Sequence, residues 1–225
     1  MRRTFEIGGK TVFVFHSNRP GSPVIYLNTY SDERQKIYEA VQATGCPPFT
    51  LVTVSNLAWN HDMAPWDSPA AFKKGEPFIG GADNYLQLLV EEIIPRAEKE
   101  LVGPPAWRGI AGYSLAGLFA LYAIYRTDVF SRVGCMSGSL WFPGFKEYIF
   151  SHEPKRRPDC IYFSLGDKEA KTRNSVLKTV QENTEEIQAF YQSKGIDTVF
   201  QLNPGNHFVQ GIERTIAGIQ WLLNR

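Results

Sequence analysis

Short apolar runs separated by turn residues and amphipathic stretches follow one another along this 225-residue chain. Runs at residues 24–28 and 49–54 carry β-branched residues between turn residues, which favours buried strands over helices. Apolar residues at helical spacing follow the first of these strands at about residues 33–43, with Ser31 or Asp32 placed to cap that helix. The pattern predicts strands that alternate with helices.

The same alternation continues to the last residues. Further strands are predicted at 11–16, 107–111, 132–136, 160–165 and 198–202, and further helices at 82–100, 115–125, 172–194 and 208–223. Pro95 indicates a kink or an early end of the helix that contains it, and Gly195 suits the C-terminal stop of the longest helix. This order is typical of an α/β fold with a mostly parallel central sheet and helices on both faces. Without a repeat or linker, residues 1–225 are expected to form a single domain.

Residues 55–81 differ in composition from the rest of the chain. Aromatic residues, among them Trp59, Trp66 and Phe78, alternate there with prolines and glycines. Long loops inside compact domains are usually functional or disordered, and the aromatic content argues against disorder. We expect an ordered wall beside a pocket, with an insertion that merely covers the sheet edge as the alternative.

The composition of the chain argues against several classes of partner. The net charge of +1 gives no general attraction to nucleic acid or to an anionic membrane. The first residues include two arginines but no apolar run, and no later segment reaches membrane-spanning length, so a cytoplasmic location is expected. Cys46, Cys135 and Cys160 lack metal-ligand spacing and are expected to be free thiols, the last two buried. No metal or cofactor is expected.

Candidate chemistry lies between the predicted strand 107–111 and the helix that follows it. A strand, a tight turn with serine at its tip and then a helix is the order of the nucleophile elbow in α/β-hydrolases. Gly112 and Gly117 supply the small neighbours that such a strained serine needs. Ala116 stands where the G-x-S-x-G pattern has its second glycine, and Gly-x-Ser-x-small also occurs by chance. The motif makes Ser114 a candidate nucleophile.

The order of the remaining polar residues fits the same chemistry. In α/β-hydrolases the acid and then the histidine follow the nucleophile along the chain. His207 comes after the last predicted strand and before the last helix, where a general base is required. Asp167 and Glu169 both follow the strand that ends at Leu165, and their spacing does not choose between them.

An oxyanion hole needs two backbone N–H donors aimed at the developing negative charge. One donor is expected from Leu115, the residue after the candidate nucleophile. The other is expected from the loop after the strand 24–28, at Thr29 or alternatively Tyr30.

Three stretches of the chain resemble a known family. They are residues 112–121, 130–133 and 137–141, and together they resemble the Putative esterase family of α/β-hydrolases. That family includes siderophore esterases, feruloyl esterases, S-formylglutathione hydrolases and mycolyltransferases. The resemblance extends from about Val24 to the C-terminus, and its members usually read G-x-S-x-G-G at the elbow, from which Ala116 departs.

The resemblance also implies a choice of acid. In related feruloyl esterases the acid stands three residues after a glycine at the end of the strand. Transferred onto Gly166, this rule selects Glu169 over Asp167. Together with the order of the residues, it implies that Ser114, His207 and Glu169 form a catalytic triad.

These observations predict a serine hydrolase that cleaves carboxylic esters through an acyl-enzyme. An acyltransferase on the same scaffold and a non-catalytic binding protein with a hydrolase fold are the alternatives. The partner is expected to be a small-molecule ester whose apolar or aromatic part contacts Trp59, Trp66 and Trp141. The oligomeric state is not predicted.

Overall fold

The central element is one mixed eight-stranded sheet with the strand order β1-β2-β4-β3-β5-β6-β7-β8. The computed structural model describes residues 2–30 and 32–225. The strands are β1 (Arg2–Ile7), β2 (Lys10–Phe15), β3 (Val24–Asn28), β4 (Thr50–Ser55), β5 (Arg108–Tyr113), β6 (Arg132–Met136), β7 (Cys160–Gly166) and β8 (Asp197–Asn203). From β4 to β8 the neighbours in this order are parallel, whereas β2 is antiparallel to both β4 and β1.

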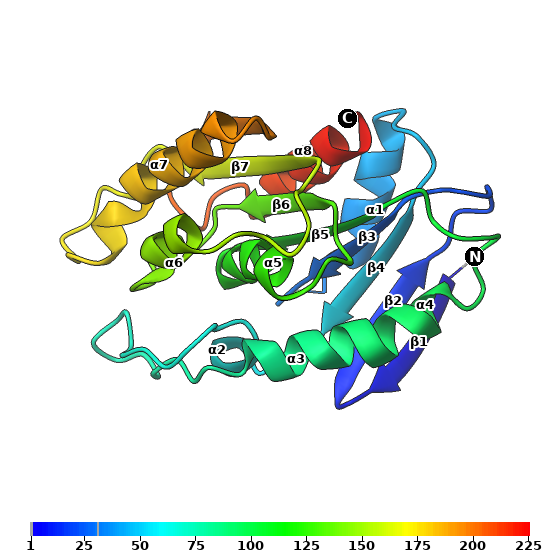
Figure 1. The fold of residues 1–225 in the computed structure, drawn as a ribbon, viewed down its shortest axis with the longest axis horizontal. Coiled ribbons are helices and arrows are strands. Elements are labelled where there is room, and N and C mark those ends of the chain that lie inside the picture. Colours follow the sequence, from blue (N-terminus) through cyan, green and yellow to red (C-terminus); the bar gives the residue numbers. More distant parts are fainter. Residues whose placement is uncertain (1, 31) are drawn as a thin grey trace.

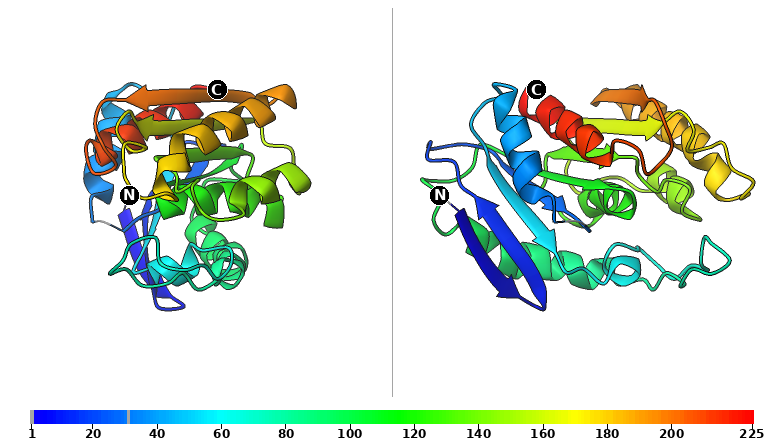
Figure 2. Two further views of the ribbon diagram at one scale, coloured as in Figure 1. Left: turned by 90° about the vertical axis from the view of Figure 1, so that its left-hand side faces the viewer. Right: turned by 180° about the vertical axis from the view of Figure 1, so that it is seen from behind.

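The inner parallel strands are buried because helices cover both faces of the sheet (Figure 1). All residues of β3 and β7 are buried, as a strand needs when apolar layers lie on both sides. One face packs against α1 (Arg34–Ala43) and α8 (Gly211–Leu223). The right-hand view of Figure 2 shows this face of the molecule. The other face packs against α3 (Ala82–Leu88), α4 (Ile94–Glu98), α5 (Leu115–Arg126), α6 (Phe145–Ser151) and α7 (Val180–Ser193).

This architecture confirms the predicted α/β fold with a mostly parallel sheet and helices on both faces. Helix α5 lies deepest, since every residue from Leu115 to Tyr125 is buried. No helix in the described parts of the chain is both long enough and apolar enough to cross a membrane.

Strand β1 was not predicted. Its residues alternate between exposed positions and half-buried or buried ones at the edge of the sheet, so the segment lacks the apolar run of an inner strand. Gly8 and Gly9 both have positive φ, 53° and 73°, and form the tight turn that joins β1 to β2. A Gly-Gly pair before an alternating segment is a hairpin signal, and it marks this turn.

Other boundaries shift for local reasons. A π-helical turn, η1 (Leu89–Ile93), lies between α3 and α4 and absorbs the break imposed by Pro95, which has no N–H to donate. The longest helix begins later than predicted, at Val180 after the 3₁₀ turn η2 (Leu177–Thr179), and α6 was not predicted.

Asp32, one of the two predicted caps of α1, is paired with a charged side chain of the helix. The residue before the helix is Glu33, which makes no side-chain capping bond, and Asp32 forms an ion pair with Arg34 instead. Ser31, the other predicted cap, lies outside the described residues.

Candidate active site

Ser114 occupies a strained position between β5 and α5. Its φ of 62° and ψ of −125° fall in a region that residues other than glycine rarely adopt. Two backbone bonds fix this turn: the Ser114 N–H donates to the Met136 carbonyl, and the Ser139 N–H donates to the Ser114 carbonyl, both at 3.0 Å. The serine is therefore held at the carboxyl end of the sheet, as the elbow motif predicts.

The departure at Ala116 is accommodated by the residue across the turn. A Cβ atom at Gly112 would collide with the backbone and the methyl group of Ala116. Because Gly112 has no Cβ, the fully buried Ala116 fits without displacing the strand. Gly117 is also required, since a Cβ there would lie 3.0 Å from the Gly112 carbonyl oxygen. Positions 112 and 117 are thus the tight ones, and position 116 tolerates a methyl group.

The structure brings the three predicted triad side chains into one hydrogen-bonded line. His207 Nε2 lies 3.0 Å from Ser114 Oγ, and His207 Nδ1 lies 2.7 Å from Glu169 Oε2. The Tyr113 hydroxyl donates to the His207 carbonyl at 2.7 Å and so holds the histidine loop against the elbow. Asp167, the alternative acid, instead accepts the Gly205 N–H at 2.8 Å and shapes the loop after β8.

Glu169 is buried yet strongly partnered. Its side chain is 4% exposed, and its second oxygen accepts the Gly166 N–H at 2.7 Å and the Arg214 guanidinium at 2.8 Å. Burial on its own would raise the pKa of this carboxyl, but His207, the Gly166 N–H and Ser137 together outweigh it and lower the pKa below its ordinary value. Glu169 is therefore an anion that faces the imidazole.

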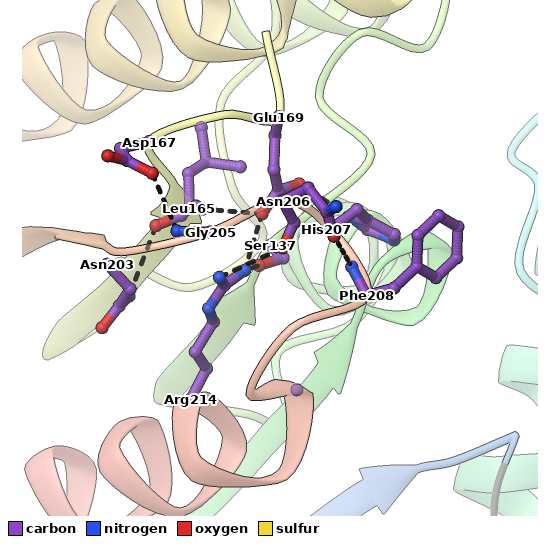
Figure 3. A network of polar contacts seen from close by, with 12 residues as sticks. Ser137, Leu165, Asp167, Glu169, Asn203, Gly205, Asn206, His207, Phe208 and Arg214 are labelled. Carbon is purple, nitrogen blue, oxygen red and sulfur yellow. Dashed lines mark hydrogen bonds and ion pairs between the residues drawn. The ribbon is translucent and has the colours of Figure 1, made fainter. Parts of the chain in front are cut away.

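Arg214 contacts Glu169 at the carboxylate oxygen that does not face His207 (Figure 3). This arginine was not predicted. Its side chain is 1% exposed and reaches from α8 to Glu169. It also donates to the Ser137 hydroxyl at 2.9 Å and to the Pro204 and Asn206 carbonyls at 3.2 Å each. One guanidinium thus holds both the acid and the loop that carries the histidine.

The sequence does contain a signal for Arg214. The residue lies four positions before Gly218 and eight before Leu222, which are both buried in α8. A charged residue in register with the apolar face of a helix is unusual, because burying a charge is costly unless it is paired.

The first choice for the second oxyanion donor does not fit the structure. The Thr29 N–H donates to the Val54 carbonyl at 3.0 Å and so continues the β3–β4 pairing. Tyr30, the alternative, has an N–H without an acceptor among the described residues. The N–H of Leu115 in the first turn of α5 also has no acceptor among the described residues, so Leu115 stays the predicted first donor.

A cavity of about 1080 Å³ opens onto Ser114 and His207. The long segment between β4 and α3 contains the short helix α2 (Trp59–Asp62) and forms one wall of it, mainly through residues 57–61. Of the three predicted substrate-contacting tryptophans, Trp59 lines the cavity. Trp66 and Trp141 are not among the described lining residues.

Trp66 and Trp141 have packing roles instead. The Trp66 indole donates to the Pro143 carbonyl at 3.0 Å and packs edge-on against Phe142. Trp141 packs against Phe78 with ring centroids 5.9 Å apart. Both rings therefore join the long segment to the loop after β6, and the aromatic pattern alone did not distinguish this from a contact with ligand.

The cysteines lie apart from this site. Cys46, Cys135 and Cys160 are free thiols, and the last two are buried as predicted. Burial raises the pKa of Cys160 to about 12, so it is a thiol at neutral pH. In the described part of the chain, no group of three or more His, Cys, Asp or Glu side chains is arranged to hold a metal ion.

Comparisons with known proteins bear on the fold and the family of this chain. A protein of Bacillus subtilis (strain 168) described as Uncharacterized protein YbbA is 21% identical over 223 residues, which cover 94% of this chain and 89% of that protein. The IroE-like serine hydrolase of Shewanella oneidensis superposes with a TM-score of 0.82 at 18% identity, over 100% of this chain and 80% of that one. The siderophore hydrolase EstA of Aspergillus nidulans gives 0.77 at 18% identity, over 99% and 94%.

These solved structures share the α/β-hydrolase fold with this chain, as the sequence predicts. Residues 12–218 match the family model described as Putative esterase. Since that match spans most of the 225 residues, the chain belongs to the Putative esterase family.

Proposed function

We propose that this protein is a serine hydrolase that cleaves small-molecule carboxylic esters through an acyl-enzyme. The observation that carries the proposal is the hydrogen-bonded line from Ser114 through His207 to Glu169, which opens onto a cavity large enough for an organic ester. Membership of an esterase family supports the same reaction class. Siderophores are one candidate class of ester, because EstA is described as a siderophore hydrolase.

In the first half of the proposed reaction, Ser114 Oγ attacks the carbonyl carbon of the ester, and His207 Nε2 takes the hydroxyl proton. The carbonyl oxygen becomes an oxyanion that accepts hydrogen bonds from the backbone N–H groups of Leu115 and Tyr30. Glu169 holds the imidazole in the correct tautomer and stabilises the imidazolium. When the tetrahedral intermediate collapses, the ester C–O bond breaks, and the alcohol leaves with the proton from His207.

In the second half, water attacks the carbonyl carbon of the acyl-serine. His207 removes a proton from that water, and the same oxyanion donors stabilise the second tetrahedral intermediate. Breakage of the bond to Ser114 Oγ releases the carboxylic acid, and the proton returns from His207 to the serine. In an acyltransferase, an alcohol would take the place of water in this step. Product analysis with added alcohols distinguishes hydrolysis from acyl transfer.

The test is the Ser114→Ala variant with p-nitrophenyl acetate as substrate. We expect turnover to fall to the level of the buffer, because no other group in the line can form the acyl-enzyme. Ser139→Ala is the matched control, since its hydroxyl lies 3.4 Å from that of Ser114. A fluorophosphonate probe should label the wild type and the Ser139 variant but not the Ser114 variant. Wild-type turnover by Ser114→Ala would disprove the mechanism, and an unlabelled wild type would indicate a non-catalytic binding protein.

A further inference from the structure

Three carboxylates line the candidate active-site cavity. Glu33, Glu76 and Glu213 line the cavity, and no lysine or arginine is found among its described lining residues. The chain as a whole has a net charge of +1, so this excess of carboxylates is a local property of the cavity. A cleft lined by charges of one sign raises the local concentration of ligands of the opposite sign.

Three cationic side chains from segments next to the cavity are paired with carboxylates. Arg34 next to Glu33 forms an ion pair with Asp32, and Lys10 forms one with Asp62 in the helix that lines the cavity. Arg214 lies behind the site in its pair with Glu169. These pairs leave the negative sign of the lining in place, so an anionic substrate group would meet repulsion there.

Exposed aromatic rings accompany the carboxylates. Tyr30 is 81% exposed and packs edge-on against Trp59, with the ring centroids 5.5 Å apart. Phe208, beside the candidate base, is 87% exposed, and all three rings line the cavity. Rings without a protein partner on one face attract cations through their quadrupole, and organic ammonium and guanidinium groups are the cations that proteins commonly bind in this way.

We propose that the ester substrate of this site carries a positively charged organic group, such as a quaternary ammonium, and is not an anion. This inference rests on the proposed hydrolase activity and adds the chemical class of its substrate. The cation lies against Tyr30, Trp59 or Phe208 while the carboxylates supply the surrounding field, and the ester carbonyl reaches Ser114. The preference is electrostatic, so it applies to a charge on the acyl or the alcohol part.

The test compares esters that differ in charge but little in shape. For the acyl part these are the p-nitrophenyl esters of 4-(trimethylammonio)butanoic acid, 5,5-dimethylhexanoic acid and glutaric acid. For the alcohol part they are acetylcholine and its neutral isostere 3,3-dimethylbutyl acetate. Each kcat/KM is divided by the rate constant for hydroxide hydrolysis of the same ester. At low ionic strength we expect the cationic ester to exceed its neutral isostere by about tenfold in at least one series, and the anionic ester to be the poorest.

Salt and charge reversal identify the origin of the preference. In about 0.5 M salt the ratio of the normalised kcat/KM of the cationic ester to that of its neutral isostere should fall to about twofold, because exposed charges are screened. Glu76→Lys with Glu213→Lys should remove or invert the ratio. Glu92→Lys with Glu182→Lys is the matched control, since these exposed glutamates change the net charge equally but do not line the cavity.

The outcomes separate this inference from the proposed function. Equal normalised rates for cationic and neutral esters in both series, or a faster anionic ester, would overturn the charge preference while leaving the hydrolase intact. A ratio that changes equally in the control pair would also overturn it, because the effect would then come from net charge. If the wild type hydrolyses neither these esters nor p-nitrophenyl acetate, the proposed function itself fails.

Discussion

The two carboxylates after β7 lie two residues apart but point to different partners. Glu169 faces the imidazole of His207 and the guanidinium of Arg214, whereas Asp167 accepts a backbone N–H from Gly205. Sequence spacing leaves both open as the acid, because each follows the same strand. Their hydrogen-bond partners assign Glu169 to the imidazole and Asp167 to the loop.

This difference predicts unequal losses of activity. Glu169→Gln should lower kcat for p-nitrophenyl acetate by about 10³-fold or more, because the amide favours the wrong tautomer of His207 and does not stabilise the imidazolium. Asp167→Asn should cost about tenfold or less, through looser anchoring of the loop that carries His207. Steady-state kinetics measure both, and a greater loss in the Asp167 variant would make Asp167 the functional acid.

Arg214 should matter for stability as well as for activity. Arg214→Met leaves the Glu169 carboxylate buried without its cation, so we expect the free energy of unfolding to fall by about 3–5 kcal/mol. Arg214→Lys keeps the charge but loses the fork that reaches Ser137, Pro204 and Asn206, and its loss should be smaller. Urea denaturation measures both values. Equal stability of the methionine variant and the wild type would show that the guanidinium contributes nothing to the fold.

At the scale of the elements, the inner strands and the edge strand β8 were predictable, whereas the other edge strand, β1, was not. The apolar runs of β3 and β7 reveal strands buried on both faces, because such a strand has little choice of residue. Strand β1 has one solvated edge and carries polar residues, so its pattern is weak, and its main signal is the turn at Gly8 and Gly9.

The candidate site shows the same division. Ser114 and His207 were predictable because chemistry and strand order restrict where they stand, whereas the choice of Glu169 over Asp167 came from the family resemblance. Arg214 was not predicted, although its place on the apolar face of a helix is a signal, and the choice between the N–H groups of Thr29 and Tyr30 stayed open because the direction of one N–H depends on packing in three dimensions. Trp66 and Trp141 show the converse, because their sequence context is the same whether they meet a ligand or another ring.

The elbow provides a test at this scale. Gly112→Ala places a methyl group against the buried Ala116, where neither the strand nor the helix has room to move, so we expect a loss of about 2–3 kcal/mol in stability together with lower activity. Ala116→Gly restores the family pattern and should cost only about 1 kcal/mol, through the entropy of a helical glycine. Thermal unfolding and p-nitrophenyl acetate turnover measure both. A neutral Gly112→Ala would show that the turn is looser than its geometry indicates.

Across the whole molecule, the polar network of Figure 3 ties together segments that are distant in sequence. Arg214 of α8 contacts the loop after β7 through Glu169, the loop after β6 through Ser137 and the loop after β8 through Asn206. These three loops follow neighbouring strands at the carboxyl edge of the sheet. A change in the charge of Glu169 should therefore be felt in global unfolding and not only in catalysis.

The pH dependence of unfolding tests this coupling, and its sign follows from the lowered pKa of Glu169. A carboxyl whose pKa is lower in the folded state stabilises the fold fully above its unfolded pKa, and loses that contribution as the pH falls through the folded pKa. Glu169→Gln lacks the contribution at every pH. The stability gap between wild type and this variant should therefore be constant above about pH 5 and narrow below about pH 4.5.

Urea denaturation of both proteins between pH 7 and pH 3 measures this gap, with Glu182→Gln on the exposed face of α7 as the control. The control should follow the wild type across the range, because an exposed carboxylate without a buried partner has little effect on folding. A gap that stays constant or widens in acid would mean that Glu169 is not held as an anion by its partners. A gap that narrows in acid would show that the charge of Glu169 contributes to the free energy of unfolding. The reason is that protonation of Glu169 leaves Arg214, which connects the three loops, buried without a counterion.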